Sequence, residues 1–102
     1  MQPRLLALTF ADVLSWLVTY RGELVDVTLS THPGGVLFDG PAVLRNVEDK
    51  RPGRDSALLR LDLDGFGVYV NEATVSDPIL ETGSDAIWLG LPGNVALELR
   101  PL

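Results

Sequence analysis

The spacing of hydrophobic residues along the chain changes once, at Gly22. From Phe10 to Tyr20 the few polar residues recur at helical spacing and leave a wide apolar arc, which predicts an amphipathic helix over residues 9–21. Thr9 with Asp12 three residues later forms a capping-box pattern, and Gly22 is a natural stop. An arc this wide indicates either a helix that plugs the end of a barrel or one that also contacts a partner.

After Gly22 apolar and polar residues alternate, which is typical of half-buried strands. Residues 23–30 form the first such strand, and a turn rich in proline and glycine follows it. The second strand region runs from Val36 to Val47 and is interrupted by Gly40-Pro41. Because proline cannot donate to a ladder, we expect a sharp bend, a bulge or a sheet edge there.

Two turn sequences predict hairpins. Asp64-Gly65 separates two alternating runs, and Leu91-Pro92-Gly93-Asn94 separates two apolar segments near the end of the chain. A further strand is expected around Val75. The polar stretch from Glu48 to Ser56, with Pro52-Gly53 at its centre, is the expected mobile loop.

One helix followed by six or seven short strands predicts a mainly β fold. At 102 residues the chain has room for one domain. We expect an N-terminal helix (9–21), a small bent antiparallel barrel (23–80) and an extra C-terminal hairpin as an extension (82–102).

Composition indicates the compartment. The chain has no cysteine, which excludes disulfides and thiolate ligands and fits a reducing environment. No apolar stretch reaches the roughly 18 residues of a membrane span, and the apolar run at residues 5–8 is too short for a signal peptide. We therefore expect a cytoplasmic protein without a membrane partner.

Few residues suggest chemistry. His32 is the only histidine and lies in a turn without further metal ligands. Asp62-Leu63-Asp64-Gly65 resembles the opening of a calcium loop, but Ala73 stands where its glutamate is required. We expect no catalytic residue, metal or cofactor, and no enzyme. The alternative is a carboxylate acid/base site, if the alternating acids converge: Asp26, Asp39, Asp62, Asp64 and Glu72.

The formal net charge of −6 disfavours nucleic acid, whose affinity for proteins comes largely from neutralised phosphates. Half of the eight basic residues nevertheless fall within ten positions: Arg45, Lys50, Arg51 and Arg54. Acidic residues at Glu48, Asp49 and Asp55 nearly cancel their charge. This segment is either a possible anionic-ligand loop or an ordinary solvated loop.

The stretch from Phe10 to Leu80 resembles a divergent member of the Sm-like (LSm/Hfq-type) small β-barrel superfamily. The resemblance rests on a glycine before the first strand (residues 22–29), on Gly40 with Ala42 and Leu44, and on residues 67–75 with Ile79. It implies a short helix followed by five bent strands that join into rings. The family's RNA-binding asparagine and basic element are missing from residues 48–56 and from Asn71-Glu72, so the uridine pocket does not carry over.

The leading hypothesis is a non-enzymatic oligomerising or scaffold module, because open strand edges associate unless they are blocked. The partner is a second copy of the chain or another protein. The candidate oligomer contacts are Trp16, Tyr69, Val70, Val75 and Ile79. The alternative is an RNA-binding Sm-like ring protein that uses the basic loop.

Overall fold

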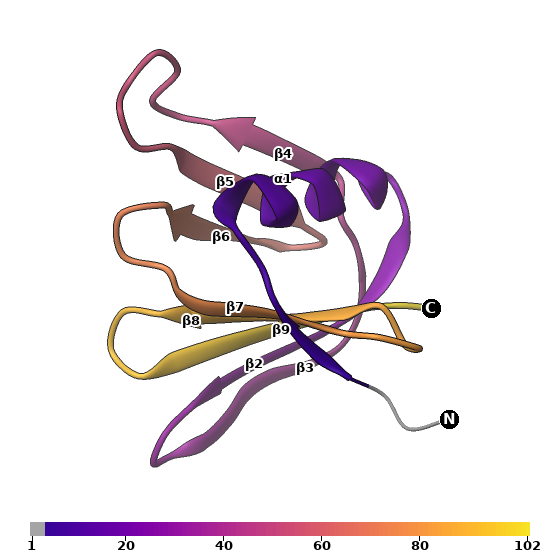
Figure 1. The fold of residues 1–102 in the computed structure, drawn as a ribbon. Helices are drawn as coiled ribbons and strands as arrows, with labels where there is room; N and C mark the ends of the chain where they lie inside the picture. Colours follow the sequence, from indigo (N-terminus) through magenta and orange to yellow (C-terminus); the bar gives the residue numbers. More distant parts are fainter. Residues whose placement is uncertain (1–3) are drawn as a thin grey trace.

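The computed structural model describes residues 4–102 as nine strands and one helix (Figure 1). In chain order the elements are β1 (Leu5–Ala7), α1 (Phe10–Thr19), β2 (Leu24–Thr31), β3 (Gly35–Val43), β4 (Asn46–Asp49), β5 (Leu58–Leu63), β6 (Phe66–Asn71), β7 (Ser76–Glu81), β8 (Ala86–Leu91) and β9 (Val95–Pro101). The predicted mainly β class, with one short helix and antiparallel strands, is confirmed. No helix in this part of the chain is long and apolar enough to cross a membrane.

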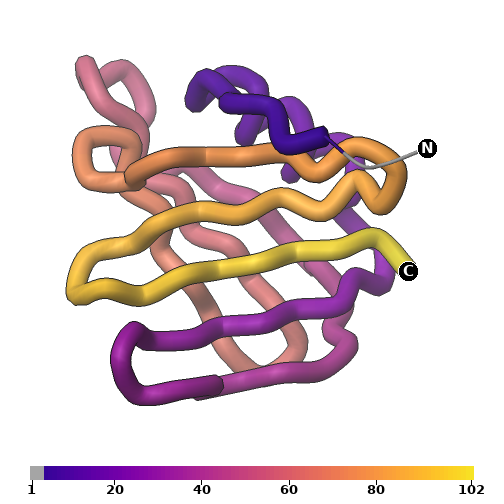
Figure 2. The backbone as a smooth tube through the Cα atoms, turned by 60° about the horizontal axis from the view of Figure 1, so that its bottom comes forward, coloured from indigo at the N-terminus to yellow at the C-terminus, as the bar shows by residue number. Residues whose placement is uncertain are grey.

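The strands form two antiparallel sheets. The larger sheet has the order β1-β7-β8-β9-β2-β3, and the smaller one has the order β4-β5-β6. Figure 2 shows the larger sheet in front, with the strands of the smaller sheet crossing behind it at a steep angle. The bent strands of the predicted barrel are thus distributed over two packed sheets.

The hydrophobic core lies between the two sheets and the helix. Both sheets contribute the alternate, inward-facing residues of their strands, as the period of two requires. Helix α1 adds Val13, Trp16 and Leu17, which are 8% exposed or less. The opposite faces of the strands are left to solvent.

The predicted capping box closes the start of α1. Thr9 Oγ1 accepts a hydrogen bond from the Asp12 amide at 3.2 Å, and Asp12 Oδ2 accepts one from the Thr9 amide at 2.9 Å. These bonds hold the pKa of Asp12 below its ordinary value. Gly22, at φ +88°, makes the turn out of the helix into β2.

The break in the second predicted strand region is at Leu44-Arg45 and not at Gly40-Pro41, where the sheet edge is the one of the three expected features that the structure shows. Gly40 and Pro41 lie inside β3, where they pair with β2, and Pro41 is tolerated because β3 is an edge strand. The fully buried Leu44 forms the corner. Its amide donates to the Glu23 carbonyl at 3.0 Å, and the next amide donates to the Asp62 carbonyl of the other sheet at 2.7 Å.

Both predicted hairpins form, one as β5–β6 and the other as β8–β9. The C-terminal hairpin lies in the middle of the larger sheet, where β9 pairs with β2. The first strand, β1, was not expected from the sequence, and it pairs with β7 at the far edge of the same sheet. These non-local pairings place residues from both ends of the chain on one surface.

Candidate functional site

The predicted basic cluster divides into paired and unpaired cations. Arg45 Nε lies 2.6 Å from Asp64 Oδ1, and Lys50 Nζ lies 3.3 Å from Glu48 Oε2. The Val43 amide and Arg45 both donate to Asp64, which lowers the pKa of its carboxyl group. Arg45 is therefore held at the sheet corner and does not line the loop cavity described next, which corrects its assignment to an anionic-ligand loop.

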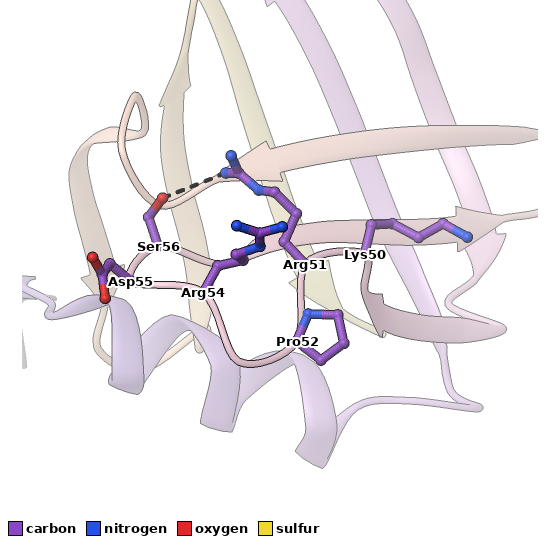
Figure 3. Close-up of a pocket in the computed structure, with 6 residues that line it drawn as sticks. All are labelled: Lys50, Arg51, Pro52, Arg54, Asp55 and Ser56. Carbon is purple, nitrogen blue, oxygen red and sulfur yellow. Dashed lines mark hydrogen bonds between the residues drawn. The ribbon is translucent and has the colours of Figure 1, made fainter.

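A cavity of about 550 Å³ lies on the loop between β4 and β5. It is lined by Lys50, Arg51, Pro52, Arg54, Asp55 and Ser56. Figure 3 shows the Arg51 and Arg54 side chains on the same side of the loop, whereas Lys50 and Asp55 extend in opposite directions away from them. Two guanidinium groups thus share this cavity.

A second candidate surface lies on the outer face of the larger sheet, at its β1 end. Leu5, Ile79 and Trp88 meet there around a cavity of about 380 Å³, with Glu81 at its side. We call these three residues the Trp88 patch. Leu5 is 67% exposed and Trp88 is 38% exposed, so the patch combines a rigid aromatic ring with accessible aliphatic surface.

The strand register explains why the patch faces outward. In β8 the neighbours of Trp88, Ile87 and Leu89, point into the core, so Trp88 points the other way. Ile79 is directly opposite Trp88 on β7, and Leu5 is opposite Glu81 from β1. The consecutive strands β7 and β8 and the distant N-terminal strand β1 therefore build one apolar surface.

Acidic side chains flank the patch on the side of β9 and β2. Glu98 pairs with Trp88 across β8 and β9 and with Thr28 on β2. Partial burial raises the pKa of Glu98, nearby Glu81 and Asp26 raise it further, and Arg100, whose Nη2 is 2.9 Å from Glu98 Oε2, opposes the rise. The outer face thus has an apolar end next to an acidic one.

The five predicted contact residues are scattered over the fold. Trp16 and Val70 are buried in the chain's own core, so their assignment as partner contacts is corrected, and Val75 is partly buried against the same core. Tyr69 is 51% exposed, but it lies on the smaller sheet beneath the Arg60 guanidinium. Ile79 alone belongs to the Trp88 patch.

Sequence reasoning missed Trp88 and Leu5. The position of Trp88 between two inward-facing residues was a usable signal, because a large aromatic on the solvent face of a strand is unusual. No comparable signal marked Leu5, since β1 is only three residues long and is defined by its pairing with β7.

The carboxylates, whose convergence was the condition of the alternative enzyme hypothesis, do not come together. Asp62 binds Arg60, Asp64 binds Arg45 and Glu72 accepts the Ala57 amide, each at a different place on the smaller sheet and its loops. Asp26 and Asp39 lie on β2 and β3 of the larger sheet. Within residues 4–102, no three His, Cys, Asp or Glu side chains are grouped so as to hold a metal ion, and His32 is exposed in the β2–β3 turn.

These features define a small two-sheet, mainly β protein with an exposed aromatic patch and a loop cavity lined by arginines. Its fold is similar to that in the crystal structure of the Bacillus subtilis YojF protein, with a TM-score of 0.55 over 96% of each chain. The two sequences are 16% identical, so the likeness concerns the fold alone. No protein-family model and no curated protein matches this sequence. The resemblance to Sm-like barrels stays a prediction.

Proposed function

We propose that the chain is a non-enzymatic assembly module that associates with a second copy of itself through the Trp88 patch. The observation that carries the proposal is the exposure of Trp88, Ile79 and Leu5 side by side on an outer sheet face. Tryptophan is among the residues that most often act as energetic anchors of protein interfaces.

Two of the four edge strands, β3 and β4, are poorly suited to pairing with another strand. The outermost strand β3 contains Pro41, and Leu37 is an extra residue between the pairs Leu29–Phe38 and Ser30–Val36. A bulge and a proline both hinder pairing with another strand. Strand β4 is four residues long and ends in Glu48 and Asp49, which has the same effect.

The arrangement of charge favours a second copy with one particular orientation. The acidic flank, with Glu98 and Asp26, lies on one side of the patch, towards β9 and β2. Consider two copies related by a two-fold axis that runs through the patch parallel to the strands. The acidic flank of each copy would then extend past the β1 edge of the other copy. The apolar surfaces would then meet without opposing the two acidic flanks, and Glu81, which lines the patch cavity, is the acidic residue that stays close to the interface. Apolar surface also continues around β1 to Leu6, which is 44% exposed.

Sedimentation equilibrium over a range of protein concentrations tests the proposal. We expect a reversible dimer whose dissociation constant rises about 1,000-fold in Trp88→Ala, since an interface anchor contributes about 2 kcal/mol or more and a two-fold interface loses one from each subunit. Tyr69→Ala is the matched control, because Tyr69 is also an exposed aromatic but lies on the other sheet. A strictly monomeric wild type, or an equal effect of both substitutions, would refute the proposal.

A further inference from the structure

The cations of this chain differ in whether a carboxylate compensates them. Four have an acidic oxygen within 4.0 Å: Arg45, Lys50, Arg60 and Arg100. Within the part of the chain that the structure describes, the other four, Arg4, Arg21, Arg51 and Arg54, have no such partner. Of these, Arg51 and Arg54 line the cavity between β4 and β5, although three acidic residues lie nearby in the sequence.

Neutral groups position the Arg51 guanidinium. Its Nη2 donates to Asn71 Oδ1 at 3.1 Å and to Ser56 Oγ at 3.5 Å, the latter bond drawn in Figure 3. Its Nε is buried without a hydrogen-bond partner. Because neutral acceptors do not compensate the charge of a partly buried guanidinium, Arg51 retains a strong attraction for an anion.

Two of the neighbouring acids hold the loop backbone, whereas Asp55 lines the cavity and extends away from the two arginines (Figure 3). Asp49 Oδ1 accepts from the Arg51 amide at 2.9 Å and from the Leu58 amide at 3.3 Å. Glu72 Oε1 accepts from the Ala57 amide at 2.9 Å. These bonds fix both ends of the loop and direct the two carboxylates to amides instead of to the arginines.

We infer that the loop between β4 and β5 binds a single phosphate group carried by a small molecule, with Arg51 and Arg54 as its cationic ligands. A tetrahedral oxyanion offers oxygens to two guanidinium groups at once, which is the arrangement that arginine pairs favour. With Arg51 held by Asn71 and Ser56, the exposed Arg54 is the group that adjusts to the ligand.

The surroundings favour a compact anion over a nucleic acid strand. The lining of the cavity contains no aromatic residue on which a base could stack. Outside this loop the chain is acidic, with a net charge of −6 for the whole sequence, so further phosphates of a long polyanion would meet repulsion. One phosphate group avoids that cost.

The test is a titration of the full chain with inorganic phosphate at constant ionic strength, followed by nuclear magnetic resonance of the loop amides. We expect saturable shifts of residues 50–58 and at least about tenfold weaker binding in Arg54→Gln. Arg45→Gln is the control, because it removes the same charge from the same stretch of sequence but outside the cavity. Absence of saturable binding, or an equal loss in both variants, would overturn the inference.

A second arm separates the two sources of phosphate. We expect the dissociation constant of a single-stranded oligonucleotide, expressed as the concentration of its phosphate groups, to be no lower than that of inorganic phosphate. Tighter, strongly salt-dependent oligonucleotide binding would show that the loop belongs to a nucleic-acid surface and that the inference is wrong. Because the cavity and the Trp88 patch lie on different sheets, Arg54→Gln should leave the dimer dissociation constant unchanged, and the two proposals can fail separately.

Discussion

The two tryptophans of this chain should respond to substitution in opposite ways. Trp16 is 8% exposed, and its indole Nε1 donates to the Asp85 carbonyl at 2.8 Å. Its ring centroid lies 4.4 Å from that of Tyr20. Trp16 therefore ties α1 to the turn between β7 and β8, whereas Trp88 lies on the outer face of that sheet.

Trp16→Phe keeps one aromatic ring but removes the donor. The Asp85 carbonyl is left without its partner, which costs about 1–3 kcal/mol, and the lost ring atoms leave a small void that adds about 1 kcal/mol. The free energy of unfolding should thus fall by about 2–4 kcal/mol. For a domain of this size that corresponds to a drop in Tm of roughly 8–30 °C.

Urea unfolding followed by circular dichroism measures this loss, at protein concentrations low enough that association does not stabilise the fold. Trp88→Ala should cost less than about 1 kcal/mol in the same assay, because its cross-strand contacts are partly solvated. If Trp16→Phe costs under about 0.5 kcal/mol, or if the two variants lose equal stability, the division between a core and an interface tryptophan is wrong.

Two further predictions concern the sheet corner and the acidic flank. Leu44→Ala should lose about 3–5 kcal/mol in urea unfolding because a fully buried leucine leaves a cavity, whereas Leu24→Ala, 49% exposed, should lose less than about 1 kcal/mol; equal losses would contradict the corner's role. The pKa of Glu98 is raised on folding, so its contribution to stability is present below its ordinary pKa of 4.5 and is lost as the pH rises through the folded value. Glu98→Gln should therefore raise the free energy of unfolding at about pH 7 by about 0.5 kcal/mol or less. Thermal melts below about pH 4 should show no such gain. A gain that persists there would mean that folding does not raise the pKa of Glu98.

Local interactions were readable from the sequence, as Thr9, Asp12 and the Asp64-Gly65 turn illustrate. The capping box joins residues three positions apart, and a two-residue turn joins adjacent runs, so each depends on atoms that sequence places together. The alternation that predicted β2 and the two hairpins has the same basis, because successive side chains of a strand point to opposite faces.

The Trp88 patch and the pairing of the arginines could not be predicted from the sequence, because both depend on contacts between distant parts of the chain. Trp88 is part of a patch only because β7 pairs with β1 and β8, which brings Leu5 within reach from the other end of the chain. Arg45 was grouped with Arg51 by sequence, but the corner at Leu44 gives Arg45 the carboxylate of Asp64. Trp16 was taken for a partner contact because sequence cannot tell which part of a wide apolar arc the fold itself covers.

The sequence alone determined the mainly β class, the capped helix, the two hairpin turns and the concentration of arginines in one loop. Each of these depends on the periodicity of hydrophobic residues or on residues that are close together in the chain. Tertiary structure alone decided which strands became neighbours, which arginines kept their charge uncompensated and which apolar side chains stayed outside. The physical reason is that strand pairing, side-chain burial and the compensation of charges depend on residues tens of positions apart in sequence. The distances between such residues are fixed only when the two sheets pack together.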